Sequence, residues 1–83
     1  PNPFNPATTI AFTLPERCQV NLRVFNILGQ EVRNLVNQTL PAGEHKIVFD
    51  GLDRHGDQLA TGVYLYRIDT EAFSKSRKMI LMK

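Results

Sequence analysis

The sequence has no tryptophan and only one cysteine, Cys18, among its 83 residues. A single cysteine cannot form a disulfide within the chain, and no histidine or second cysteine lies at zinc-ligand spacing from it. Cys18 is therefore expected to be a small, half-buried side chain. The lack of tryptophan also argues against a carbohydrate-binding surface, which needs flat, exposed aromatic rings.

The chain also lacks a long apolar run and a segment with the layout of a signal peptide. No run approaches the roughly 20 residues of a membrane-spanning helix, and no basic start followed by an apolar centre opens the sequence. We expect no membrane insertion, and we expect any signal peptide to lie on a longer parent chain.

The length allows one domain, because a chain this short places nearly all its apolar residues in one core. The net charge is only +2, but no acid follows Glu71 and the last nine residues contain four cations, Lys75, Arg77, Lys78 and Lys83. Nucleic-acid binding usually needs a broader basic surface with exposed aromatics, so no nucleic-acid partner is expected.

Alternating apolar and polar residues predict strands over Thr9–Leu14 and Val20–Val24. Pro15 ends the first strand, and a turn is expected at Glu16-Arg17. We expect these two strands to pair. Gly29 then favours a hairpin turn before a third strand over 31–36. A helix over 27–35 is the competing interpretation, which Gly29 and the β-branched valines weaken.

The second half of the chain continues the β pattern. Leu40–Gly43 has the proline and glycine of a type I turn, and His45, Ile47 and Phe49 then share one strand face. The apolar segment 63–68 is expected to be a central strand covered on both faces. The last strand, 73–82, should be exposed in its first half and buried in its second. Six or seven such strands predict an antiparallel β-sandwich.

No constellation for catalysis stands out, so we expect no enzyme and no cofactor. His45 shares its strand face with apolar residues, which favours a half-buried histidine over a general base, and His55 is expected to be solvated in a turn. Tyr64 and Tyr66 could form a sugar-stacking platform, but their apolar strand favours burial with each hydroxyl on a backbone carbonyl.

Three carboxylates, Asp50, Asp53 and Asp57, fall in one loop, and oxygen ligands of this kind can bind Ca²⁺. Their spacing lacks the alternating ligands and closing glutamate of an EF-hand loop. Aspartate is also an ordinary turn former, so turn formation is the preferred interpretation and calcium binding stays open.

Five motifs, in order and at matching separations, cover almost the whole chain and resemble the C-terminal sorting domains (type A) of proteins exported by the type IX (Por) secretion system of Bacteroidetes-type bacteria. One departure is Phe49, where relatives often carry tryptophan. The motifs occupy residues 1–10, 24–32, 41–51, 61–67 and 77–83.

The resemblance implies an all-β, immunoglobulin-like antiparallel sandwich of about seven strands over residues 8–83, after an extended linker over 1–7. It implies a non-catalytic secretion signal that directs a parent protein from the periplasm through the outer-membrane translocon to the cell surface or the medium. The implied partners are the type IX translocon and a surface sortase, and the domain is expected to be monomeric.

Within this resemblance, we place translocon recognition on the basic terminal strand, at Lys75, Arg77, Lys78 and Lys83. Nine further residues match the family motifs and are expected to be structural: Pro3, Phe4, Asn5, Pro6, Gly29, Gly43, Gly51, Gly62 and Tyr64.

Two alternatives come from other functional classes. The immunoglobulin-like domain of flagellar hook-capping proteins has a similar glycine- and aspartate-containing loop followed by a Gly-Val-Tyr strand, which would make this chain a structural assembly module. A carbohydrate-binding appendage of a secreted hydrolase would need exposed aromatics.

Overall fold

The structure is a computed structural model that describes residues 7–82. The motif residues Pro3, Phe4, Asn5 and Pro6, and the cation Lys83, lie outside the described residues. Six strands occur in this part of the chain: β1 (Thr8–Leu14), β2 (Cys18–Phe25), β3 (Glu31–Leu40), β4 (Gly43–Phe49), β5 (Gly62–Asp69) and β6 (Ser74–Leu81).

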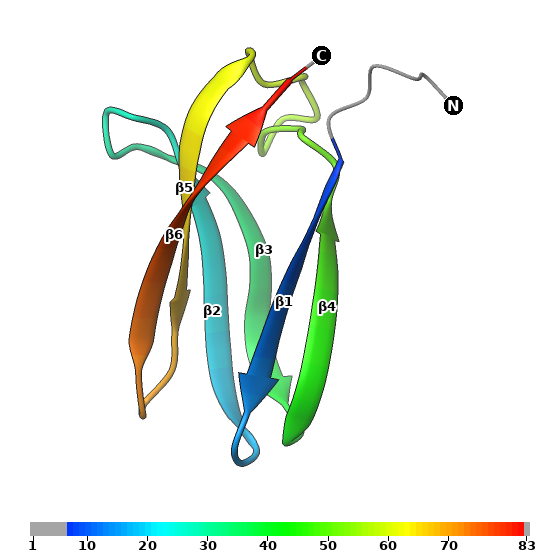
Figure 1. The fold of residues 1–83 in the computed structure, drawn as a ribbon, viewed down its shortest axis with the longest axis vertical. Helices are drawn as coiled ribbons and strands as arrows, with labels where there is room; N and C mark the ends of the chain where they lie inside the picture. The colour runs from blue at the N-terminus through cyan, green and yellow to red at the C-terminus, as the bar shows by residue number, and fades with distance from the viewer. Residues whose placement is uncertain (1–6, 83) are drawn as a thin grey trace.

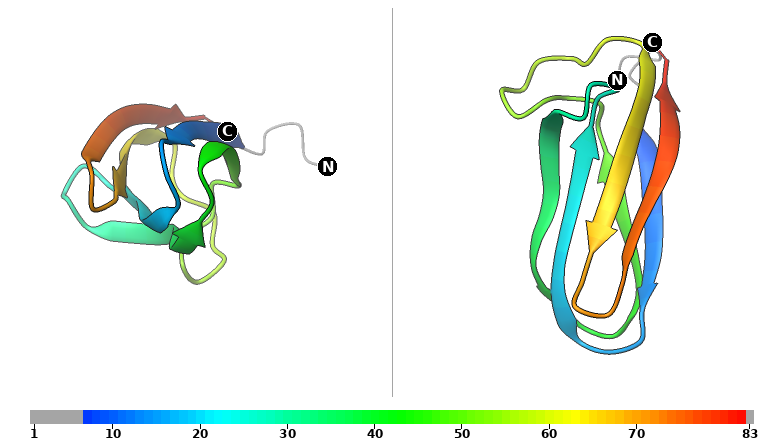
Figure 2. Two further views of the ribbon diagram at one scale, coloured as in Figure 1. Left: turned by 90° about the horizontal axis from the view of Figure 1, so that it is seen from below. Right: turned by 90° about the vertical axis from the view of Figure 1, so that its left-hand side faces the viewer.

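The strands form two antiparallel sheets that pack face to face (Figures 1 and 2). One sheet has two strands, β1 and β4, and the other has four in the order β3-β2-β5-β6. The predicted all-β, immunoglobulin-like sandwich is confirmed. The six strands within residues 7–82 agree with the six or seven that the sequence pattern predicts.

The expected pairing of the first two strands is wrong. β1 pairs with β4, from Thr8 opposite Phe49 to Leu14 opposite Gly43, while β2 pairs with β3 and β5. The turn after Leu14 carries the chain from one sheet to the other. Alternating polarity shows that one face of each strand is buried, but it does not show whether the next strand lies beside it or across the core.

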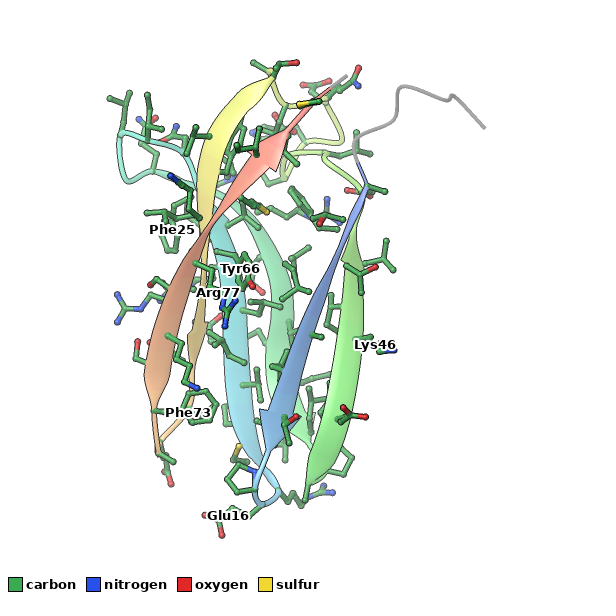
Figure 3. All side chains as sticks on the ribbon, viewed as in Figure 1. Glu16, Phe25, Lys46, Tyr66, Phe73 and Arg77 are labelled. Atoms are coloured by element: carbon green, nitrogen blue, oxygen red, sulfur yellow. The ribbon has the colours of Figure 1, made fainter. Side chains whose placement is uncertain are left out.

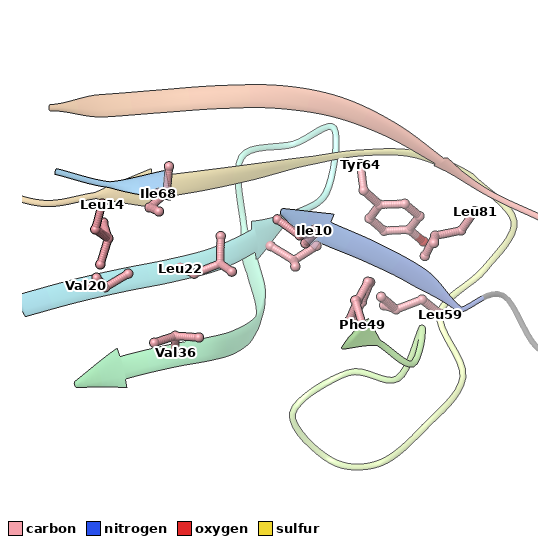
Figure 4. Packing of buried hydrophobic residues seen from close by; sticks show 11 residues of the cluster. Ile10, Leu14, Val20, Leu22, Val36, Phe49, Leu59, Tyr64, Ile68 and Leu81 are labelled. Carbon is pink, nitrogen blue, oxygen red and sulfur yellow. The ribbon is translucent and has the colours of Figure 1, made fainter. Parts of the chain in front are cut away.

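The core lies between the sheets and consists of the inward residues of both, together with Leu59 of the loop before β5 (Figure 4). Leu14 of β1 and Val20 of β2 contribute from opposite layers, and Leu22, Val24 and Phe49 are fully buried. Each fully buried apolar side chain of this size contributes about 1.5–3 kcal/mol relative to an exposed one. The period-two pattern of the sequence therefore corresponds to the buried face of each strand.

The apolar strand β5 lies between β2 and β6, so its central position in the sheet is confirmed. Its expected coverage on both faces is wrong. Tyr64 and Ile68 are buried on the inner face, but Val63 is 40% exposed and Leu65 is 43% exposed on the outer face. The cause is the two-layer architecture, since the second sheet covers only one face of the first.

The last strand follows its prediction. Residues 74–78 of β6 are exposed, Met79 is half-buried, and Leu81 is only 2% exposed in the core. The carboxyl half of β6 is thus an integral part of the sandwich.

The turn between β2 and β3 is a hairpin, so the competing helix over 27–35 is wrong. The Asn26 side-chain oxygen accepts hydrogen bonds from the backbone N–H groups of Leu28 and Gln30, each at 3.0 Å. Gly29 closes the turn with φ of 80°, a conformation that glycine adopts at little cost. Residues 7–82 include no helix, and hence no helix suited to crossing a membrane.

Candidate interaction surface

The predicted recognition cations lie on β6, which forms one edge of the four-stranded sheet. Lys75 and Arg77 are opposite Ile68 and Tyr66 in the register and therefore face the inner side. Lys78 is opposite the exposed Leu65 and faces the outer side. The structure thus divides the three described cations between two faces of one strand rather than gathering them on one.

Lys75 and Arg77 help to line a groove of about 250 Å³ between the edges of the two sheets. We call it the seam groove; it is lined by residues of β1, β5 and β6 together with Phe73. Figure 3 shows Arg77 beside Tyr66, with Phe73 at the start of β6. Its lining residues are Ile10, Ala11, Phe12, Thr13, Tyr66, Ile68, Phe73, Lys75 and Arg77.

Sequence reasoning missed the β1 part of this groove. Phe12 is half-buried, and its ring stacks on His45 with the ring centroids 5.4 Å apart. The alternation around Phe12 predicted a strand but carried no signal that this strand would lie near β6. That neighbourhood depends on the crossing between sheets after Leu14.

A larger groove of about 530 Å³ lies where the β1–β2 and β5–β6 connections come together. It is lined by polar and charged residues with Cys18 and Phe73 among them, and Phe73 therefore lines both grooves. Cys18 is half-buried and free, which confirms its predicted environment.

On the outer face, Asp69 connects three strands. Its carboxylate accepts hydrogen bonds from Ser74 Oγ at 2.7 Å, Arg23 Nη2 at 2.8 Å and Arg67 Nε at 2.9 Å. The bond from Ser74 contributes most, and together with the two arginines it outweighs burial and lowers the pKa of Asp69 to about 2. This carboxylate is ionised at neutral pH and ties β2, β5 and β6 together.

The three loop aspartates are engaged in local structure. Burial raises the pKa of the Asp50 carboxyl, but hydrogen bonds from the Leu52 N–H and from Arg33 outweigh it, so the pKa is lowered. The Asp53 carboxylate accepts from the N–H groups of Asp57 and His55, and these bonds lower its pKa. Within residues 7–82 no three acidic, histidine or cysteine side chains cluster as metal ligands would.

His45 and Tyr64 lie as predicted. His45 Nε2 donates to the Pro41 carbonyl oxygen at 2.8 Å, and the half-buried ring packs on Phe12. Tyr64 is buried, and its hydroxyl donates to the Ala60 carbonyl oxygen at 2.6 Å. Tyr66 is half-buried on the same face, so the two rings do not form an exposed platform. His55 is exposed in the loop before β5.

The family-motif glycines lie at turns and strand ends. Gly29 lies in the β2–β3 turn, Gly43 and Gly62 begin β4 and β5, and Gly51 follows β4. Gly51 is buried and has φ of 79°, so a side chain there would be strained.

A protein-family model, the FlgD Ig-like domain, matches residues 4–72, which is more than half of the chain. The chain belongs to the FlgD Ig-like domain family. No curated protein matches the chain. The match supports the hook-capping resemblance, whereas neither the family match nor the solved structures support the resemblance to type IX sorting domains or an origin in Bacteroidetes.

Two solved structures share the fold of this FlgD Ig-like domain. FlgD from P. aeruginosa superposes with a TM-score of 0.70 at 21% identity, over 90% of this chain and 59% of that one. FlgD from Xanthomonas campestris superposes with a TM-score of 0.70 at 22% identity, over 95% of this chain and 56% of that one. Its structure is described as giving insights into the hook capping essential for flagellar assembly. The chain thus spans less than two thirds of either protein.

Proposed function

We propose that this FlgD Ig-like domain is a structural assembly module, a rigid sandwich through which a larger protein contacts its neighbours in an assembly of the hook-capping type. The observation that carries the proposal is the family match over residues 4–72. The structure of the X. campestris FlgD is described as giving insights into hook capping, which supports the kind of assembly.

The chemistry of the described residues agrees with a structural role. Four of the side chains from which a general base or a ligand could be drawn, those of His45, Asp50, Asp53 and Asp69, each form a hydrogen bond within the fold. Such side chains hold turns and strands in place, which a rigid contact module requires.

The test is a chimera in which this chain replaces the Ig-like domain of a hook-capping protein in a flagellated bacterium that lacks its own. We expect hooks to be built and motility to be restored in part, as seen by electron microscopy of hooks and by spreading in soft agar. A matched chimera carrying Leu22→Asp, which places a carboxylate in the core, should fail. A stable, exported wild-type chimera that builds no hooks would overturn the proposal.

A second candidate is the sorting function, in which the parent protein is carried through the type IX translocon. One observation favours it: the family match ends at residue 72, before β6, and β6 carries exposed cations at a sheet edge. Under this proposal the translocon reads the terminal strand, with or without later cleavage by a sortase.

The sorting candidate is tested by fusing the chain to the C-terminus of a periplasmically exported fluorescent protein in a type IX-competent bacterium. Charge reversals at Lys75, Arg77 and Lys78 are preferable to deletion of the strand, because deletion would also remove the buried Leu81. Surface fluorescence that requires the translocon and is lost with the reversals supports sorting. Fluorescence retained in the periplasm with a folded wild-type domain rejects it.

A further inference from the structure

The two sheets of the sandwich differ in width. Adjacent strands lie about 4.8 Å apart, so a sheet of two strands covers only about half of a facing sheet of four. A two-residue connection keeps β4 close to β3, and the shortfall therefore lies on the side of β1, against β5 and β6. Figures 1 and 2 show β1 and β6 near each other at the end of the molecule where β6 finishes and diverging toward the other end.

The seam groove occupies this uncovered side, and its lining shows how each strand meets it. β1 contributes four consecutive residues, 10–13, which point alternately to both faces of the small sheet. Only a groove that runs along the edge of a strand contacts consecutive residues. β5 and β6 instead contribute alternate residues, Tyr66 with Ile68 and Lys75 with Arg77, so the groove meets their inner face.

The edge of β1 that faces the groove has no pairing strand among residues 7–82. Along such an edge, every second residue directs its N–H and C=O away from the partner strand. The residues that carry these groups, 10–13, line the seam groove together with Tyr66 and Phe73. The groove therefore combines backbone hydrogen-bonding groups with an apolar floor, which is what an added strand requires.

The charge of the seam groove has one sign. Lys75 and Arg77 are its only charged lining residues, and no acid of the described chain forms a salt bridge with either. The Lys75 ammonium lies 5.5 Å from the centre of the Phe73 ring, next to the apolar floor. A segment with carboxylates beside its apolar residues would complement this groove.

From these observations we propose that the seam groove accepts one extended segment of a partner protein, with alternating apolar and acidic side chains. The segment pairs with the edge of β1, so that the small sheet gains a third strand. Its apolar side chains pack on Tyr66, Ile68 and Phe73, and its carboxylates meet Lys75 and Arg77. The inference rests on the proposed assembly function, because it names the kind of contact that the module makes.

The test uses the 83-residue chain and a labelled, end-capped peptide of eight residues that alternates valine and glutamate. Fluorescence anisotropy measures affinity, and amide hydrogen exchange followed by NMR locates the site. Two control peptides carry lysine in place of glutamate, or proline at two central positions, which removes strand hydrogen bonds. We expect saturable binding of the glutamate peptide alone, with slower exchange at residues 10–13.

The chain offers matched variants. Lys75→Glu with Arg77→Glu reverses both groove cations, and affinity should fall about tenfold because two attractions become repulsions. Lys46→Glu with Lys78→Glu makes the same change of net charge on outward faces, and affinity should stay within about twofold. Melting curves identify any variant that fails to fold, and Lys75→Gln with Arg77→Gln then takes its place.

Several results would overturn the inference: no saturable binding, equal binding of the lysine peptide, or protection at β3 or β4 in place of β1. Concentration-dependent dimers in light scattering with protection at residues 10–13 would assign the groove to a second copy instead. If the amides of residues 10–13 that point away from β4 are already protected in the monomer before any peptide is added, another segment of the same chain fills the groove and the inference is overturned. A chimera that builds hooks while the peptide fails to bind would reject this inference alone, and the reverse pattern would reject the assembly function.

Discussion

At the residue scale, Asp69 has more defined roles than any other charged side chain of the outer face. It ends β5 and accepts hydrogen bonds from residues of three strands, Arg23, Arg67 and Ser74. Arg23 Nη1 in turn lies 3.7 Å from Glu31 Oε1, and Arg23 Cζ lies 5.3 Å from the centre of the Phe25 ring. Exposed ion pairs taken singly contribute little, but a carboxylate that accepts three charge-assisted or hydroxyl bonds resists protonation.

We predict that Asp69 makes the fold acid-sensitive in a defined window. Its pKa in the folded chain is about 2, below the ordinary value of 3.8, so the ionised form stabilises the folded state. This stabilisation is complete above the unfolded-state pKa and is lost as the pH falls through 3.8 toward about 2. Urea unfolding at a series of pH values should show a drop in the free energy of unfolding across this window.

The Asp69→Asn variant tests the assignment. We expect it to be less stable by about 1–2 kcal/mol at neutral pH, because the amide loses charge-assisted bonds. We also expect its free energy of unfolding to fall less steeply between pH 3.8 and about 2. Glu71→Gln, a change at an exposed carboxylate two residues away, is the control and should leave both quantities unaltered. If the free energy of unfolding of Asp69→Asn falls with acid as steeply as that of the wild type, the prediction is contradicted.

At the element scale, the β2–β3 hairpin depends on its turn. Asn26 binds the backbone of the turn through its side chain, and Gly29 adopts φ of 80° with open space around its α-carbon. A substitution at Gly29 therefore meets no steric neighbour and changes only the conformational preference of the backbone.

We predict a ranking of Gly29 variants on this basis. Gly29→Ala should reduce the free energy of unfolding by about 1–2 kcal/mol, the usual cost of a left-handed conformation for a side chain with a β-carbon. Gly29→Asn should cost less, because asparagine tolerates this region. Chemical denaturation measures the free energy of unfolding of the two variants. If Gly29→Ala and Gly29→Asn lose the same amount, the backbone angle at residue 29 does not determine the stability of the turn, and the prediction is contradicted.

The elements also show what sequence patterns can and cannot predict. The period of two located β1, β2, β4 and the inner residues of β6, because burial on one face is a local property of a strand. Pairing is not local: β1 meets β4 only because the chain crosses the core after Leu14. The apolar outer residues Val63 and Leu65 of β5 likewise resemble those of a strand covered on both faces.

The candidate surface was predicted in part for the same reason. The cations Lys75, Arg77 and Lys78 were identified from composition, and the alternation of β6 already separates the first two from the third. The groove beside Lys75 and Arg77 was not predictable, because four of its nine lining residues are Ile10–Thr13, more than sixty positions earlier in the chain than these cations. Only the arrangement of the two sheets brings these residues together.

At the scale of the whole molecule, stability depends on a small core. Stabilities of about 0.05–0.15 kcal/mol per residue correspond to about 4–12 kcal/mol for 83 residues. The described chain has no disulfide, since Cys18 is free, and its buried cluster draws on both sheets and on the loop residue Leu59. The free energy lost when one well-buried side chain is removed is therefore a large fraction of the total free energy of unfolding.

This balance makes the terminal strand essential to the fold as well as a candidate for recognition. Leu81 lies in the core beside Tyr64 (Figure 4). Its side chain is 2% exposed, whereas that of its neighbour Met82 is 67% exposed. We predict that Leu81→Ala costs about 2–5 kcal/mol and lowers the melting temperature by at least about 10 °C, while Met82→Ala changes little. Thermal melts followed by circular dichroism provide the comparison.

The same pair of variants determines how any truncation of the terminal strand is to be interpreted. Suppose that Leu81→Ala lowers the melting temperature and the charge reversals at Lys75 and Arg77 do not. A loss of export or of assembly on deletion of β6 then reflects unfolding, and only the charge reversals test recognition. If Leu81→Ala has the same melting temperature as the wild type, β6 contributes little to the core. Deletion of β6 is then a valid test of what the strand binds.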